Sequence, residues 1–276
     1  MRDLLRRLLR TPQGMLGMAV VALLAVAVIA GPSLTPYAPD EMQSLARYQP
    51  PSAAHWLGTD QYGRDMLSRL LDGARSTVLM ALLATFIGTL GGAVVGTGSA
   101  YLGGRADEAI MRTMDAVMAI PSLLLALLVV SLLGSSAANA LLAIAIAFMP
   151  GMARISRSVA LAVRKQDYVS AAIARGEGAG YIVLREMLPN VIAPIVVEMT
   201  MRVSFAVMLF ATLSFLGLGA QPPATDWGLM VSEARQYLHR SYWILLWPAL
   251  AIAITAIGFN LLGDGLRDAL NPRMGG

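Results

Sequence analysis

The chain of 276 residues is 57% hydrophobic and only 14% charged, and its mean hydropathy is +0.63. This composition excludes an ordinary soluble domain and indicates a membrane protein. The net charge is +4, but the charges avoid long stretches of the chain, so the basic pI of about 9.7 reflects membrane topology and not nucleic-acid binding. Because the chain has no cysteine, disulfides, catalytic thiolates and cysteine-ligated metals are excluded.

Five uncharged stretches are long enough to cross a bilayer, which takes about 20 apolar residues in a helix. They are Thr11–Pro39, Ser76–Gly104, Ala116–Ala153, Val203–Thr225 and Ser241–Gly263. The third has 38 residues, too many for one crossing, and the small and polar residues of Gly134–Asn139 predict a turn inside it. The fifth helix must begin near Leu188 to be long enough, and the glycines of Ser214–Gly219 predict its end. The sequence therefore predicts an all-α, polytopic membrane protein with six transmembrane helices.

The distribution of positive charge predicts the orientation, because Lys and Arg in loops stay preferentially on the cytoplasmic side. With the N-terminus inside, 14 of these residues fall in cytoplasmic segments, among them Arg2, Arg6 and Arg10, and 6 fall in outer loops. Both termini are therefore expected in the cytoplasm. The stretch Met15–Ala30 follows an arginine-rich start as in a signal peptide, but it is longer than the usual apolar region of one, so we expect a retained first helix.

The charged segment between the fourth and fifth helices is the most informative part of the chain. Asp167 is suited to cap a short helix, in which Tyr168, Ala171, Ala172 and Arg175 share one face, and Gly176 is suited to end it. Two adjacent alanines let another surface approach closely. The segment is either a helix that lies parallel to the membrane and inserts into a cytoplasmic partner, or an ordinary solvated amphipathic loop.

This segment resembles the EAA motif of ABC importer permeases, through Ala171-Ala172, Gly176 and Leu188-Pro189. The resemblance is to the dipeptide/oligopeptide/nickel permease family and extends over nearly the whole chain. Further matching blocks are His55–Asp60 with Gly63–Asp65, Asp107 with Met111-Arg112 and Asp115, Ser214–Gly219 with Gln221–Pro223 and Trp227-Gly228, and Phe259–Leu270 with Pro272-Arg273. The chain departs from the family pattern at four positions. Ser170 stands where the EAA motif has its Glu, and Arg175 stands where Leu is usual. Glu186 replaces an apolar residue of the motif, and Phe210 replaces an acidic residue often seen in the fifth helix.

The resemblance implies a type I importer subunit with a coupling helix for the ATPase. The coupling residues would be Asp167, Tyr168, Ala171, Ala172, Arg175 and Gly176. The implied partners are a homologous second permease in a heterodimer, two ATP-binding subunits, an extracytoplasmic substrate-binding protein and membrane lipid, with no nucleic acid. No cofactor is expected in this chain, and ATP and Mg would be bound by the partner subunits. The implied location is the bacterial cytoplasmic (inner) membrane.

The resemblance also divides the chain into three parts. Residues 1–75 would form the first transmembrane helix and a periplasmic segment, residues 76–265 the ABC permease core with five transmembrane helices and the coupling helix, and residues 266–276 a cytoplasmic tail. Import of di-/oligopeptides is the first expectation for the function, and import of nickel or a metal–chelator complex by the same mechanism is the alternative.

The residues themselves limit the source of energy and the rival functions. Lys165 is the only lysine and is preceded by Arg164, whereas a phosphate-binding P-loop needs a Gly-Lys pair, so energy must come from a partner or an ion gradient. An ion-coupled transporter needs acidic residues at mid-membrane, and only Glu198 is a deep candidate. An intramembrane hydrolase needs a nucleophile and base together, but both histidines fall in outer loops. A non-catalytic subunit is therefore expected.

Glu198 and Arg202 are the only opposed charges expected deep in a span, about 15 Å beyond Leu188. They are either a mutually neutralising structural pair or part of the translocation pathway. In the stretches 58–75 and 227–240, interfacial helices are expected, with contact to a binding protein as the alternative. We also expect Asp65 to support Arg69 four residues on, and Arg112 to form a structural pair with Asp115, with a proton relay as the alternative. His55 and His239 are expected to be surface or capping residues, with metal ligation as the alternative.

Overall fold

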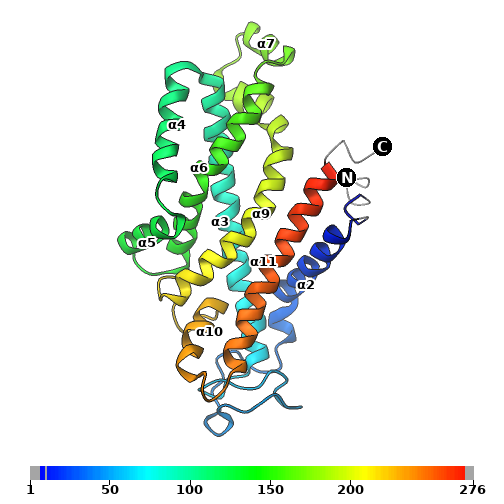
Figure 1. The fold of residues 1–276 in the computed structure, drawn as a ribbon, viewed down its shortest axis with the longest axis vertical. Helices are drawn as coiled ribbons and strands as arrows, with labels where there is room; N and C mark the ends of the chain where they lie inside the picture. Colours follow the sequence, from blue (N-terminus) through cyan, green and yellow to red (C-terminus); the bar gives the residue numbers. More distant parts are fainter. Residues whose placement is uncertain (1–6, 10, 271–276) are drawn as a thin grey trace. The chain divides into compact units, whose positions relative to one another are not determined.

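The computed structural model describes residues 7–9 and 11–270 (Figure 1). Arg2, Arg6, Arg10, Pro272 and Arg273 lie outside these ranges, as do residues 271–276 of the expected tail. The helices are α2 (Pro12–Leu34), η1 (Ser44–Ala46), α3 (Met66–Leu102), α4 (Gly104–Met118), α5 (Ser122–Leu133), α6 (Ala137–Val163), α7 (Asp167–Ala174), α8 (Ala179–Tyr181), η2 (Ile182–Met187), α9 (Leu188–Phe215), α10 (Trp227–Ala234), η3 (Arg235–Tyr237) and α11 (Trp243–Leu270). The described residues contain no β-strand, only one isolated bridge between Thr59 and Asp65. The predicted all-α class is confirmed.

Five helices of the described chain are long and apolar enough to cross a membrane. The predicted third crossing is not one helix, because α4 and α5 meet at an angle of 90°. Pro121 explains the break: a proline disfavours helical geometry at the residue before it, here Ile120, and cannot donate a helix hydrogen bond. The count of six holds if the bent pair crosses the membrane as one span.

The predicted fifth helix is longer than expected at its start. Helical structure runs without a break over the 37 residues Ala179–Phe215, and the segment η2 within it has π-helical geometry. The predicted end is confirmed, because α9 stops at Phe215 and Gly217 adopts a φ of +77°, which glycine tolerates without strain. The turn predicted at Gly134–Asn139 is also present but shorter, because only residues 134–136 lie between α5 and α6 and Asn139 is already in α6.

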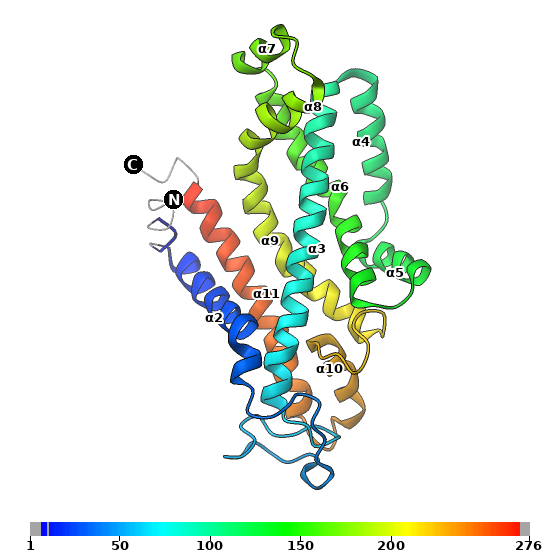
Figure 2. The ribbon, with the colours of Figure 1, turned by 180° about the vertical axis from the view of Figure 1, so that it is seen from behind.

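The chain forms two compact units, and long helices pass from one to the other. Unit 1 takes its residues from 1–83, 129–141 and 200–276, and unit 2 from 84–128 and 142–199. In unit 1, α2 lies along α11 (Figures 1 and 2). A Cβ on Gly265 would lie 2.5 Å from the Cα of Gly14, so glycine permits this close approach.

Unit 2 is built on an equally close contact between α3 and α6. Gly88, Gly92 and Gly96 recur every fourth residue on α3, and a Cβ on any of them would collide with backbone carbonyls of α6. In apolar surroundings, close backbone contact of this kind is a main source of helix association. The spacing of these glycines therefore determines which face of α3 meets α6.

Candidate functional site

The short helix expected in the segment between the fourth and fifth spans is present as α7, in unit 2 (Figure 1). The capping prediction was wrong by one residue: Gln166 has the extended backbone of the N-cap, and Asp167 is the first helical residue. An acidic side chain in the first turn still favours the helix through its dipole. Gly176, with a φ of +79°, ends the helix as expected.

One face of α7 is buried in unit 2. Val169 and Ala172 are completely buried and belong to a cluster with Ile182, Met187 and Val191. The expectation that both alanines lie on the approach face was therefore wrong for Ala172. The reason is that Val169 and Ala172, three residues apart, share a helix face that the unit's own core covers. Sequence spacing alone does not reveal which face is covered.

The opposite face of α7 is open. Tyr168 is 39% exposed and Ile173 is 50% exposed, and Ala171 and Arg175 are also exposed. Tyr168 and Ile173 therefore leave apolar surface on α7 outside the cluster that covers Val169 and Ala172. Ala171 lies on the side of α7 away from Val169, and its small exposed side chain lets another backbone approach closely.

Arg175 caps the C-terminal end of α7 and lies between two carboxylates. Its Nε is 3.7 Å from Oε1 of Glu177, and its Nη2 is 3.7 Å from Oε1 of Glu186. Arg175 and Glu186 are two of the departures from the resembled motif, and the structure pairs them. The second departure therefore compensates the charge of the first.

A second charged site in unit 2 joins α3, α4 and α6. The carboxylate of Asp107, on α4, accepts hydrogen bonds from Ser99 Oγ (2.5 Å) and from Arg157 Nε (2.6 Å) and Nη2 (2.5 Å). Asp107 is only 8% exposed, so this bidentate pair replaces the water that burial removes. Sequence reasoning missed this site because its three members are separated along the chain.

The expected pair of Arg112 with Asp115 is not the one that forms. Asp115 pairs with Arg154 of α6, and Arg112 pairs with Glu108 at 2.7 Å, four residues before it on α4. Spacings of three and four both allow contact on a helix, so the sequence could not choose between them. The approach of α6 decides the choice, because it brings Arg154 to Asp115.

A four-charge cluster links the loop of residues 35–65 to α10 within unit 1. Asp60 Oδ2 accepts from Arg64 Nε (2.6 Å) and Arg69 Nη1 (2.7 Å), and Glu233 Oε2 accepts from Arg64 Nη2 (2.8 Å) and Arg69 Nη2 (3.1 Å). Asp60 is fully buried and Arg69 is 2% exposed. The two positive and two negative charges balance, as burial requires.

Two expectations for this region were wrong. Asp65 does not support Arg69 but contacts His55, with 2.9 Å between Nδ1 and Oδ1, and accepts from the backbone N–H of Ser68 at 2.8 Å. His55 is only 5% exposed, whereas His239 is exposed as expected. The loop turns back at Gly63 and brings these groups together, which spacing along a regular helix could not predict.

The short helix α10 is anchored at its start. Trp227 is buried, and its Nε1 donates to the carbonyl of Leu70 at 2.9 Å. The Asp226 carboxylate caps the helix by accepting from the N–H groups of Gly228 (2.7 Å) and Leu229 (3.3 Å). Burial raises the pKa of the Asp226 carboxyl, although these N–H groups act in the opposite direction.

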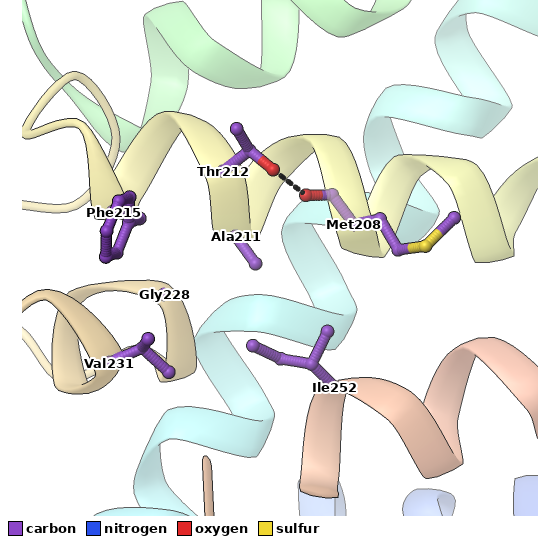
Figure 3. A pocket seen from close by; sticks show the side chains of 7 residues that line it. All are labelled: Met208, Ala211, Thr212, Phe215, Gly228, Val231 and Ile252. Atoms are coloured by element: carbon purple, nitrogen blue, oxygen red, sulfur yellow. Dashed lines mark hydrogen bonds between the residues drawn. The ribbon is translucent and has the colours of Figure 1, made fainter. Parts of the chain in front are cut away.

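Residues of α9, α10 and α11 line an open apolar pocket of about 350 Å³ in unit 1 (Figure 3). It is lined by Met208, Ala211, Thr212, Phe215, Gly228, Val231 and Ile252. The hydroxyl of Thr212 donates to the carbonyl of Met208 at 2.8 Å, so the one side-chain hydroxyl of the lining is turned to its own helix. The pocket therefore presents hydrocarbon surface.

Glu198 and Arg202 both lie on α9 and are half-buried. Phe210, the departure further along α9, is completely buried. The aromatic ring at this position therefore belongs to the packing of unit 1.

Comparison with known proteins identifies the chain. Residues 88–276 match the model of the family described as "Binding-protein-dependent transport system inner membrane component", and residues 1–51 match the "N-terminal TM domain of oligopeptide transport permease C". The chain belongs to the first of these families. The predicted resemblance to ABC importer permeases is thereby confirmed, and the chain is a multi-span permease of the inner-membrane type.

Relatives are similar to this permease over nearly their whole length. A probable D,D-dipeptide transport system permease protein of Escherichia coli (strain K12) is 42% identical over 93% of this chain and 86% of its own. A dipeptide transport system permease protein of Alkalihalophilus pseudofirmus is 38% identical over 99% and 90%, and a glutathione transport system permease protein of Pectobacterium atrosepticum is 40% identical over 99% and 91%. Membership of such a system implies ATPase and binding-protein partners for the permease.

Proposed function

We propose that this permease imports di- or oligopeptides across the bacterial inner membrane, with energy from ATP hydrolysed by partner subunits. The observation that carries the ATP-driven part is the open face of α7, with Tyr168 and Ile173 exposed on a helix whose other face is fixed in unit 2. A rigidly held helix that presents apolar side chains is suited to transmit movement from a bound partner. ATP and Mg belong to that partner, since Lys165, the only lysine, follows Arg164 and no P-loop is present.

The proposed assembly contains this permease, a homologous second permease, two ATP-binding subunits and an extracytoplasmic binding protein. Both termini and α7 face the cytoplasm, as supported by the 14 positive residues on that side against 6 on the other. Peptide cargo is preferred to nickel because the relatives are named for transport of dipeptides, D,D-dipeptides and glutathione.

Transport by the intact complex tests this function. The complex is purified from its own cells through a tag on this permease, together with the subunits that accompany it, and is reconstituted in liposomes with its binding protein. Radiolabelled Ala-Ala should accumulate only with ATP, and added Ni²⁺ should not compete. Accumulation of a nickel–chelator complex without that of Ala-Ala would overturn the choice of substrate, and uptake driven by an ion gradient without ATP would overturn the mechanism.

For Glu198 and Arg202 we propose a structural role in α9, with lining of the pathway as the alternative. A lone charge in a span costs about 2.5–3.5 kcal/mol on insertion scales, so opposed charges four residues apart favour mutual neutralisation. Arg202→Ala should impair assembly, and addition of Glu198→Ala should restore both assembly and uptake. Restored assembly without uptake would show that the pathway needs these charges.

A further inference from the structure

The segment η2, Ile182–Met187, lies in the chain between α7 and α9 (Figure 2), and its hydrogen bonding differs from that of the helix that follows it. Its last hydrogen bond runs from the N–H of Leu188 to the carbonyl of Val183, five residues back instead of the four of an α-helix. Such wide turns are rare in helices and are often found at functional sites and bends. This one lies near the start of the continuous 37-residue helical run Ala179–Phe215.

The residues that follow η2 explain its geometry. In a regular α-helix the ring of Pro189 would collide with the carbonyl of Arg185, four residues before it. A wider turn moves this carbonyl away from the ring. The side chain of Asn190 then donates from Nδ2 to the carbonyl of Glu186 at 2.8 Å, which satisfies an acceptor inside the widened turn.

The same segment is bound to α7 by two kinds of contact. Val169 and Ala172 of α7 belong to one buried cluster with Ile182 and Met187 of η2. At the end of α7, the guanidinium of Arg175 lies 3.7 Å from the carboxylate of Glu186. A displacement of α7 therefore acts first on η2.

We propose that η2 is the joint through which α7 moves α9, and that the ion pair of Arg175 with Glu186 holds α7 to this joint. The inference rests on the proposed function, because it takes α7 as the contact with the ATP-hydrolysing subunits. Return of one wide turn to α-helical geometry changes the register by one residue, which corresponds to a rotation of about 100° and a rise of about 1.5 Å between the two flanks. The joint thus converts a small push on α7 into a rotation of α9.

Deletion of Leu184 tests the joint, because it removes the extra residue of the wide turn. Leu184 is 53% exposed, so the buried cluster keeps its members. Leu184→Ala is the matched control, since it removes the side chain and keeps the register. In the reconstituted complex, the deletion should leave assembly and basal ATP hydrolysis intact. It should lower Ala-Ala uptake, and the stimulation of ATP hydrolysis by peptide-loaded binding protein, at least tenfold. Leu184→Ala should change uptake and stimulation by no more than twofold.

If the deletion left stimulated ATP hydrolysis and uptake near parental levels, the proposal that η2 is the joint would be overturned. If the variant with the deletion fails to assemble, substitutions in the ion pair test the proposal instead. Arg175→Glu alone should lower uptake at least fivefold. The double variant Arg175→Glu with Glu186→Arg, which exchanges the two charges, should restore uptake to within twofold of the parent. Failure of that exchange to restore uptake would also overturn the proposal. A parental complex that shows no stimulation or uptake would instead refute the proposed function.

Discussion

Tryptophan substitutions at the neighbouring residues Ala171 and Ala172 should have different effects: the one at Ala172 should lower stability, and the one at Ala171 should weaken coupling at parental stability. Ala172 is completely buried among Val169, Ile182 and Met187, so an indole there overfills a packed cluster. Overpacking typically costs about 1–3 kcal/mol. Ala171 is exposed, and surface substitutions usually change stability by less than about 0.5 kcal/mol. Only the Ala172 variant should therefore be destabilised.

The two variants are compared by melting temperature and by binding of the ATPase subunits. A change of 1 kcal/mol shifts the melting temperature by about 2–4 °C in a protein of 150–250 residues, so Ala172→Trp should lower it by at least about 2 °C. Ala171→Trp should melt like the parent but lose co-purifying ATPase and stimulated hydrolysis, because the indole blocks the open face of α7. Substitution to Ser at each position controls for the loss of alanine. A stable Ala172→Trp beside a destabilised Ala171→Trp would refute the assignment of the two faces.

Three further predictions concern other parts of the chain. Glu233→Ala removes one of the two carboxylates that Arg64 and Arg69 share and leaves Asp60 alone beside both guanidinium groups, so it should lower the melting temperature, at a cost below the roughly 3–5 kcal/mol of a buried charge with no partner. Glu233→Gln keeps an acceptor oxygen and should cost less, and equal melting of the two variants would contradict the cluster. Because burial raises the pKa of Asp226, the folded parent should lose stability as pH rises above the ordinary pKa of an aspartate. Asp226→Asn keeps the helix cap and should lack this loss, whereas Asp226→Ala should be about 1 kcal/mol less stable than the Asn variant. Melting temperatures of the parent and the Asn variant that change in parallel with pH would exclude the effect. In the cysteine-free background, a cysteine at Gln236 should react with an impermeant thiol reagent from outside and one at Ser170 should not, and the reverse labelling would invert the proposed orientation.

The amino-acid sequence was enough to predict the class of the protein and most of its spans. Crossing a bilayer depends on the length of an uncharged apolar run, which is a local property, so α2, α3, α6, α9 and α11 all coincide with predicted spans. Local turn chemistry likewise predicted the ends of α7 and α9 at glycines. The break between α4 and α5 also had a local signal, Pro121, which a count of charges alone did not weigh.

Tertiary structure alone decided which charges pair and which helix faces are covered. Glu233 lies 169 residues from Arg64, and Arg157 lies 50 residues from Asp107, so no spacing rule along one helix could join them. Ala171 and Ala172 have the same chemistry, yet the cluster with Ile182 covers only the second. The physical reason is that burial of a side chain and neutralisation of a charge are properties of the surrounding elements, which meet only when the chain has folded.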